Sequence, residues 1–307
     1  MIGKDFPSRI RISVERRFIF RHFRFTTTLV RPHLHMATGR DSDNSGYEAF
    51  YREFESPVMR QIREEAYGED IGQHSWVTAT ELRADIGRLA LSAAGRLLDL
   101  GCGPCGPLAF IGGIVGCRGS GIDASAAAIE AGRTRIASLG LDNLISVEVG
   151  DLNEPLNFAS HSFDAVIALD VVLHVRDRER LFRETARILK PGAKFLFTDA
   201  GVVTGCFSSE EAQDRSAHGY TQFVAPTFNE RMLESAGLRV VETEDRTASV
   251  FKNAAGRLAA VLAHSAELES LGIANLNSQR KYLETVAALS KRRALSRVMY
   301  LAESYAA

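Results

Sequence analysis

Short apolar runs alternate with amphipathic segments through the middle of the chain. The apolar runs are residues 96–100, 119–123, 144–149, 163–169 and 193–199. The segments between them that carry apolar side chains at helical spacing are residues 105–115, 125–139 and 177–189. Strands that are apolar throughout and alternate with helices are typical of a parallel sheet covered by helices on both faces. The pattern therefore predicts an α/β fold with a doubly wound sheet.

Helical patterns also precede this alternating region. Residues 46–66 carry aromatic and apolar side chains at helical spacing, and residues 78–93 repeat the pattern after a loop. We therefore expect an N-terminal helical cap over residues 41–94, followed by a main domain over residues 95–307.

The pattern becomes less regular after the last of the apolar runs. Residues 200–225 show no clear period and predict a lid insertion. A short helix over 227–236 and a strand over 238–243 follow, and Ala-rich helices are expected at about 250–290. A last strand is expected over 296–304.

Charge is distributed unevenly along the chain. Residues 1–40 hold nine basic and two acidic residues, which leaves 28 basic and 36 acidic residues in 41–307. A body with a net charge of −8 is a poor partner for a phosphate backbone, which rewards clustered lysine and arginine. The sequence therefore predicts no nucleic-acid partner.

The basic start of the chain is compatible with a nucleic-acid arm, an organelle transit peptide or a disordered tail. The residues from Met36 onward also resemble a natural start, which would make the preceding segment a mis-assigned extension. We expect a disordered or mis-assigned extension over residues 1–40 and leave it out of the fold prediction.

Two further features bear on the location of the protein. No apolar run approaches the roughly 20 residues that a membrane span needs, so we expect no membrane partner. The cysteines are too few and too clustered for a disulfide scaffold, which predicts a cytoplasmic protein. They are Cys102, Cys105, Cys117 and Cys206.

The strongest chemical signal is the segment LLDLGCGPCG at residues 97–106. Gly101, Gly103 and Gly106 lie between a predicted strand and helix, where tight turns let backbone N–H groups meet a ligand. Nicotinamide and flavin sites share these glycines. Asp99 argues against them, because its carboxylate would repel a pyrophosphate but can accept hydrogen bonds from the cationic amino-acid end of S-adenosylmethionine (SAM).

Two further acids follow the next two predicted strands. Asp123 ends the second strand, where its two oxygens can hold both hydroxyls of a ribose. Asp151 ends the third strand, where it can receive an adenine amino group. Each acid alone could simply cap a helix, but acids at three successive strand ends indicate a SAM site.

Cys102 and Cys105 form a C-x-x-C pair inside the glycine loop, a spacing known from redox and zinc sites. No second pair lies at zinc-ligand spacing in the sequence. We therefore expect the two cysteines to fill the turn as small residues, and we predict no metal site.

These segments resemble the class I SAM-dependent methyltransferases over about residues 67–245. The resemblance is carried by LLDLGCGPCG, GID, GDLNEPL and KPGAKFLFTD. It implies a Rossmann-like, seven-stranded, mostly parallel sheet of order 3-2-1-4-5-7-6, with the seventh strand antiparallel. It also implies that YGEDIGQHSW closes over the cofactor. The expected cofactor-binding residues are Gln73, His74, Ser75, Asp99, Gly101, Gly103, Gly106, Asp123, Ala124, Asp151, Leu152 and Leu169.

The acceptor side is expected at the end of the fourth predicted strand, in the segment ALDVVLHV. Asp170 and His174 are four residues apart and face the crevice that opens at the strand ends. A carboxylate could hold a cationic amine, and a nearby imidazole could remove its proton. Capping the following helix or packing beneath it remains an alternative role for His174, and for Asp170 a contact with the cofactor remains an alternative to a contact with the acceptor.

The spacing of Asp170 and His174 is similar to that of small N-methyltransferases that modify phosphoethanolamine or glycine-type amines. In the phosphoethanolamine enzymes the histidine pairs with a tyrosine of the N-terminal helix, which implies this role for Tyr47 or Tyr51. Those enzymes also bind the acceptor's phosphate through the lid. The resemblance implies acceptor contacts by Tyr220 and His218, although this sequence has His218 where an arginine is expected.

We therefore predict an enzyme that transfers a methyl group from SAM to a small-molecule acceptor, foremost an amine, as a monomer or homodimer. One alternative is an O- or C-methyltransferase that acts on an apolar natural product. Another is a SAM-binding protein without catalysis. A nicotinamide oxidoreductase is the least favoured class because of Asp99.

Overall fold

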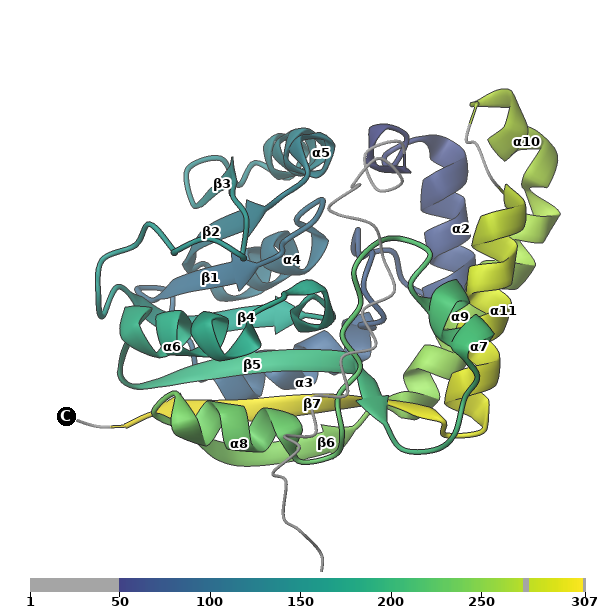
Figure 1. Cartoon of the computed structure of the whole chain (residues 1–307). Helices are drawn as coiled ribbons and strands as arrows, with labels where there is room; N and C mark the ends of the chain where they lie inside the picture. The colour runs from purple at the N-terminus through teal and green to yellow at the C-terminus, as the bar shows by residue number, and fades with distance from the viewer. Residues whose placement is uncertain (1–49, 273–275, 306–307) are drawn as a thin grey trace, which may run out of the picture. The chain divides into compact units, whose positions relative to one another are not determined.

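A seven-stranded sheet forms the centre of the computed structural model, which describes residues 50–272 and 276–305 (Figure 1). The strands lie in the order β3-β2-β1-β4-β5-β7-β6, and β7 is antiparallel to both of its neighbours. The predicted order and the antiparallel seventh strand are confirmed. The strand bounds are β1 Arg96–Leu100, β2 Arg118–Asp123, β3 Ile145–Val149, β4 Phe163–Leu169, β5 Leu189–Val203, β6 Leu238–Asp245 and β7 Leu295–Ser304.

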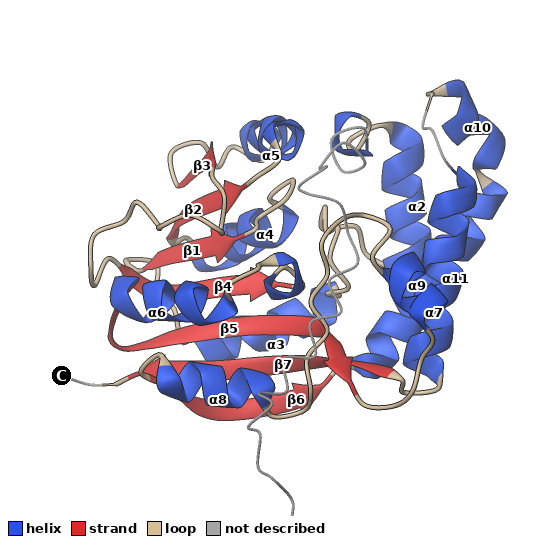
Figure 2. Cartoon of the chain, in the orientation of Figure 1, coloured by secondary structure: helices blue, strands red, loops and turns tan. Residues whose placement is uncertain are grey.

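Helices cover both faces of the sheet (Figure 2). Neighbouring residues of a strand point to opposite faces, so Leu97 and Leu98, both fully buried, belong to two different core clusters. This burial on both faces confirms the doubly wound sheet. The helices on one face are α3 (Ala79–Leu89), α4 (Gly106–Val115) and α5 (Ala126–Ser138), and those on the other are α6 (Arg178–Ile188) and α8 (Phe228–Ser235).

A separate helical layer lies beyond the carboxyl ends of the parallel strands (Figure 1). Apolar side chains of α2, α9 and α11 form its common core. The layer therefore combines a helix that precedes the first strand with helices inserted between β6 and β7, whereas α3 packs on the sheet. The helices of this part are α2 (Pro57–Tyr67), α7 (Ser209–Arg215), α9 (Thr247–Ala263), α10 (Ser265–Ser270) and α11 (Leu276–Lys291).

The prediction of one helix over residues 46–66 is wrong in its described part. The chain is helical at residues 50–52 and turns at residues 53–55, and α2 begins at Pro57 after the N-cap residue Ser56. Proline suits the first helical position but disrupts a helix interior, so the apolar spacing continues while the helix does not. The second helix also ends earlier than predicted, because Ala90 adopts a left-handed conformation with φ 50°.

β5 is longer than the predicted run 193–199. It pairs with β4 from Leu189 and with β7 as far as Val203. Residues 200–203, which were expected to open the lid, are therefore strand. The lid segment that follows contains α7 and returns to the sheet through a bridge between Val202 and Val224.

A buried ion pair joins α6, β5 and α8 on one face of the sheet. Arg178 donates to Asp199 Oδ2 at 2.5 Å and to Asn229 Oδ1 at 2.9 Å. Asn229 in turn donates to Asp199, and the arginine and aspartate side chains are 1% and 0% exposed. Removing one member of such a pair leaves an uncompensated buried charge.

We therefore expect Arg178→Met to lower the free energy of unfolding by about 3–5 kcal/mol, because Asp199 loses its cationic partner. The matched control is Arg183→Met on the same helix. Arg183 pairs with Glu179, and both side chains are about half exposed, so this change should cost less than about 1 kcal/mol. Urea unfolding of both variants measures the two effects. Equal losses would contradict the assigned role of the buried pair.

Candidate functional site

A cavity of about 590 Å³ opens between the carboxyl ends of the parallel strands and the helical layer. Loops that follow β1, β2, β3 and β4 line one side, and residues of α7, α9 and α11 line the other. Ligand pockets commonly measure about 300–1,000 Å³, and ligands of open α/β sheets bind at the carboxyl ends of the strands. This cavity is therefore the candidate site.

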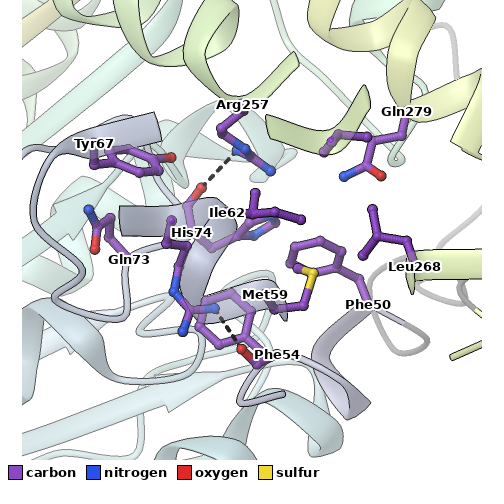
Figure 3. A pocket seen from close by; sticks show the side chains of 12 residues that line it. Phe50, Phe54, Met59, Ile62, Tyr67, Gln73, His74, Arg257, Leu268 and Gln279 are labelled. Carbon is purple, nitrogen blue, oxygen red and sulfur yellow. Dashed lines mark hydrogen bonds between the residues drawn. The ribbon is translucent and has the colours of Figure 1, made fainter. Parts of the chain in front are cut away.

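A second cavity, of about 20 Å³, lies among aromatic and apolar side chains of the helical layer (Figure 3). It is large enough for a water molecule but not for a substrate. Arg257 faces both cavities and makes a long hydrogen bond of 3.5 Å to the backbone carbonyl of His74.

Asp99 lines the large cavity, although the residue is only 2% exposed. Burial raises the pKa of this carboxyl to about 8, and the negative charge of Asp123 adds to the rise. Within the described residues no hydrogen-bond donor offsets this burial. A buried carboxyl of this kind, open to a cavity, can be satisfied by a cationic donor of a ligand.

Asp123 closes the glycine loop from the end of β2. Its carboxylate accepts hydrogen bonds from the backbone N–H of Gly103 at 2.8 Å and of Ser125 at 2.9 Å. Gly101 and Gly103 both have positive φ, and a Cβ on Gly101 would lie 2.4 Å from the Val171 side chain. The first two glycines are therefore required for the shape of the cavity floor.

Gly106 has a packing role in the structure, and its expected cofactor contact stays a prediction. The residue is absent from the cavity lining, and a Cβ there would lie 2.2 Å from the carbonyl oxygen of Gly72. Its missing side chain thus lets the segment before α3 pack onto the start of α4.

Gln73 also departs from its expected place. Its side-chain oxygen accepts from the Ile71 N–H at 2.9 Å, and its amide donates to the Glu69 carbonyl at 3.2 Å. The residue is 1% exposed and braces its own loop. His74 and Ser75 do line the cavity, and the Ser75 hydroxyl is buried without a hydrogen-bond partner in the described structure.

The remaining expected cofactor residues lie at the strand-end side of the cavity. They are Ala124, Asp151, Leu152 and Leu169. Asp151 accepts hydrogen bonds from the backbone and side-chain N–H groups of Asn153 at 2.8 and 2.9 Å. The three acids at successive strand ends thus line one cavity, as the sequence predicted; their contacts with a ligand stay a prediction.

Asp170 is held in a strained position directly after β4, with φ 57°. Its carboxylate accepts hydrogen bonds from the Trp76 N–H, the Thr198 hydroxyl and the Arg297 guanidinium, each at 2.8 Å. Arg297 is itself fully buried. Arg297 also binds the Glu81 carboxylate at 2.9 Å. Both oxygens of Asp170 thus already accept hydrogen bonds inside the protein, which favours a positioning role over the expected capture of a cationic amine.

His174 faces the cavity from the short 3₁₀ helix Val172–His174. Its Nδ1 lies 2.7 Å from the carbonyl oxygen of Tyr220, which places the ring proton on Nδ1 and makes Nε2 an acceptor. Burial lowers the pKa of His174 to about 4, and the positive charges of Arg215 and Arg178 contribute. The imidazole is therefore neutral at physiological pH.

Tyr51 pairs with a different histidine from the expected one. Its hydroxyl lies 2.9 Å from Nδ1 of His74, and both residues line the cavity. Burial lowers the pKa of His74 well below its usual range. The pairing follows because the loop before α3 brings His74 against the aromatic residues that precede α2. Tyr47 lies outside the described residues.

The two residues expected in the lid both line the cavity. The Tyr220 ring lies 5.7 Å from the Arg176 guanidinium, and the His218 ring meets Tyr282 edge-on at 4.5 Å. Burial lowers the pKa of His218 to about 4. Their contact with an acceptor stays a prediction.

Sequence reasoning missed the residues that build the far wall of the cavity. Arg215, Arg257 and Tyr282 come from α7, α9 and α11, and all three face the cavity. No motif or spacing links these positions along the chain, because three separate helices bring them together. Arg297 on β7, the ion-pair partner of Asp170, also gave no sequence signal, because the two residues are 127 positions apart in the sequence.

The hydrogen-bond acceptors in the strand-end half of the cavity fit the hydrogen-bond donors of SAM. Asp99 offers an unsatisfied buried carboxyl, and Asp123 and Asp151 supply further acceptors at the neighbouring strand ends. Across the described ranges, no helix is long and apolar enough to cross a membrane, and no group of three potential ligands is arranged to hold a metal ion.

Comparison with known proteins shows that this chain is similar to methyltransferases. The family description that matches residues 98–197 is a methyltransferase domain. The chain is 29% identical to phosphoethanolamine N-methyltransferase 1 of Triticum aestivum, over 67% of this chain and 40% of that protein. It is 30% identical to glycine/sarcosine/dimethylglycine N-methyltransferase of Actinopolyspora halophila, over 58% of this chain and 31% of that protein. The chain thus spans less than half the length of these curated relatives.

Solved structures share the fold. Phosphoethanolamine N-methyltransferase 2 of Haemonchus contortus, in complex with phosphomonomethylethanolamine and S-adenosylhomocysteine, superimposes with a TM-score of 0.68. The identity is 20%, and the match covers 85% of this chain and 60% of that one. The cyclopropane synthase MmaA2 of Mycobacterium tuberculosis gives 0.72 at 13% identity, over 86% of this chain and 100% of that one.

The raised pKa of Asp99 predicts a pH-dependent stability. The ordinary value is 3.8 and the folded value about 8, so the folded protein holds this proton more tightly than the unfolded chain does. Asp99 therefore opposes folding increasingly as the pH rises from about 4 to about 8, by up to about 1.4 kcal/mol per pH unit.

In the ligand-free protein, Asp99→Asn should thus become more stable than the wild type as the pH rises through this window. Urea unfolding of both proteins at a series of pH values measures the difference, in which the contributions of other titrating groups cancel. A stability difference that stays constant with pH would refute the buried, unpaired state of Asp99.

Proposed function

We propose that this chain, whose residues 98–197 match a methyltransferase domain, is a class I SAM-dependent methyltransferase that transfers a methyl group from SAM to a small-molecule acceptor, foremost an amine. The observation that carries the proposal is the buried carboxyl of Asp99, which lines a cavity of about 590 Å³ and accepts no hydrogen bond within the described structure. The relatives named as phosphoethanolamine and glycine/sarcosine N-methyltransferases support an amine as the acceptor.

We assign the cofactor half of the cavity to the loops after β1, β2 and β3. Asp99 would accept hydrogen bonds from the ammonium of the amino-acid end, and this charge-assisted bond would favour the ionised carboxylate. Asp123 would hold the ribose hydroxyls through its two carboxylate oxygens. Asp151 and Leu152 would border the adenine.

When bound, SAM supplies a methyl group on a positively charged sulfur, and S-adenosylhomocysteine is the product that remains. The protein's own task is to align the acceptor and exclude water. We assign alignment to His174, whose Nε2 can accept a hydrogen bond from an acceptor N–H. Its pKa of about 4 makes it a weak base. We therefore propose that it orients a neutral amine, and that the methylated ammonium product gives its proton to solvent after release.

We propose that Asp170 acts through the segment it holds. Its carboxylate fixes the backbone of Trp76, and the neighbouring residues His74 and Ser75 line the cavity. Tyr51 extends this arrangement because its hydroxyl binds the His74 ring. We also propose that the protein works in the cytoplasm, in keeping with its four cysteines, which are all free thiols.

The proposal is tested by calorimetric titration with SAM, followed by an assay for S-adenosylhomocysteine with a panel of small amines. We expect saturable SAM binding and amine-dependent product. Asp123→Ala should weaken SAM binding at least about tenfold, because charge-assisted hydrogen bonds are lost. Asp164→Ala is the control, since Asp164 pairs with Lys190 near the opposite end of the strands and should leave the affinity unchanged.

Three results would overturn parts of this proposal. Absence of SAM binding would remove the cofactor assignment. SAM binding without product from any acceptor would favour a non-catalytic SAM-binding protein. Product formed only with hydroxyl or carbon acceptors would favour the O- or C-methyltransferase alternative, which a relative such as 27-O-demethylrifamycin SV methyltransferase of Amycolatopsis mediterranei represents by name.

A further inference from the structure

The glycine loop contains a pair of cysteines that the proposed function does not use. Cys102 and Cys105 flank Gly103 and Pro104, and their sulfur atoms lie 3.6 Å apart. The Cys105 N–H closes the turn by donating to the Cys102 carbonyl at 3.0 Å, and Cys105 has a positive φ of 62°. A disulfide has a sulfur–sulfur distance of about 2.05 Å, so an approach of about 1.5 Å would join the pair.

The packing around the pair leaves room for the two thiols and for little else. A Cβ on Gly121 of β2 would lie 2.9 Å from the Cys102 sulfur, and one on Gly132 of α5 would lie 2.4 Å from the Cys105 sulfur. The two glycines thus provide the space that the thiols occupy. Filling of the turn by small residues alone does not require two oxidisable groups in contact.

The two thiols differ in their access to the cavity. Cys102 lines the large cavity and is 4% exposed, whereas Cys105 is fully buried. A small oxidant in the cavity therefore reaches Cys102 first, and Cys105 lies behind it as a second thiol. Redox-sensing cysteines commonly combine an accessible thiol with a resolving thiol in this way. The other cysteines lie elsewhere: Cys117 precedes the amino end of β2, and Cys206 is exposed after β5.

The surroundings of Cys102 disfavour its thiolate. The pKa of this thiol is raised well above its usual range by the hydrogen bond with Cys105, by burial and by the negative charges of Asp99 and Asp123. Attack on an oxidant requires the thiolate, so the pair would respond to sustained oxidation and not to a brief pulse. A reduced form that gains no stability from a thiolate also leaves the disulfide comparatively stable once it has formed.

The backbone between the two cysteines belongs to the floor of the cavity. Gly103 donates its N–H to Asp123 at 2.8 Å, and Cys102 donates its N–H to the Ile122 carbonyl at 3.0 Å. Asp99 lines the cavity beside the same loop. Drawing the two sulfur atoms together shifts the backbone that joins them, so bond formation alters the surface to which we assign SAM.

We propose that Cys102 and Cys105 are a reversible modification site: a peroxide converts them to a disulfide, a dithiol reductant restores them, and the disulfide weakens SAM binding. The effect on SAM rests on the proposed function, whereas formation of the bond does not.

The oxidation balances with one peroxide as the two-electron oxidant. The Cys102 sulfur attacks hydrogen peroxide, the O–O bond breaks, and a sulfenic acid and one water form. The Cys105 sulfur then attacks the sulfenic sulfur, the S–O bond breaks, and a second water leaves with the thiol proton. A dithiol reverses the change by two thiol–disulfide exchanges and is itself oxidised to a disulfide.

The first experiment detects the bond in the full-length protein. The Cys206→Ala variant, which lacks the exposed thiol that would link two molecules, is incubated with hydrogen peroxide. Remaining thiols are alkylated under denaturing conditions, and the peptides are analysed by mass spectrometry. We expect one peptide with Cys102 and Cys105 that lacks two hydrogens, an alkylated Cys117, and full reversal by dithiothreitol. Oxidation of other residues without this bond would overturn the inference.

Single variants test the order of the two thiols. Cys105→Ala should leave Cys102 as a sulfenic acid, which dimedone traps, and Cys105→Ser serves as a second variant. Cys102→Ala should leave Cys105 unreacted because it is buried. Cys117→Ala is the matched control, since it removes a buried thiol outside the loop and should form the disulfide as before. Equal dimedone labelling of Cys102 and Cys105 in the respective variants would contradict the assigned order.

Calorimetric titration with SAM measures the consequence of the bond. We expect the oxidised protein to bind SAM at least about tenfold more weakly than the reduced protein. Because such coupling is reciprocal, saturating SAM should raise the reduction potential of the pair by about 30 mV for a tenfold difference. Dithiothreitol should restore the affinity, whereas it would not repair oxidised methionines.

The outcomes separate this inference from the proposed function. A disulfide that leaves the SAM affinity unchanged would overturn the assigned effect of the bond. Absence of SAM binding in both redox states, with the bond formed, would refute the proposed function and support the modification site. SAM binding by a protein that forms no disulfide would refute the inference alone.

Discussion

The buried pair of Asp170 and Arg297 is the constraint on which the candidate site depends. Asp170 follows β4 in a left-handed conformation, and Arg297 reaches it from β7 across Thr198 of β5. The same carboxylate fixes the backbone of Trp76. One pair therefore joins the ends of three strands to the segment that carries the cavity-lining histidine and tryptophan. Loss of either charged side chain would leave its partner as an uncompensated buried charge. Loss of Asp170 would also remove the hydrogen bond that holds the backbone of Trp76.

This pairing also divides the cavity electrostatically. Arg297 binds Asp170 and Glu81 together. The cavity-lining acids Asp123, Asp151 and Glu154 lie on the strand-end side, and the cations Arg215 and Arg257 face the cavity from the helical layer. Low-dielectric walls strengthen both fields. The two sides of the cavity therefore differ in the charge that they present to a ligand.

The sequence predicted those parts of the molecule that rest on local patterns. The apolar runs predicted the sheet. The acids at the strand ends predicted that Asp123 and Asp151 line one cavity, because the carboxyl ends of parallel strands share one edge. Features that depend on residues distant in the sequence could not be predicted. The helical spacing of apolar residues continues past Pro57 although a new helix begins there, and the glycine motif gives no sign that Gly106 packs against Gly72. The cavity wall formed by α7, α9 and α11 could not be predicted from the spacing of residues, because three separate helices bring its side chains together.

The central claim is that a buried, largely protonated Asp99 becomes the carboxylate partner of the SAM ammonium. Its most direct test is calorimetric SAM binding near neutral pH in two buffers with different heats of ionisation, which reports the protons exchanged. A carboxyl whose pKa falls from about 8 on binding should release close to one proton per bound SAM. Asp99→Asn should abolish this release and weaken binding. Tight binding with the same proton balance in both proteins would contradict the account.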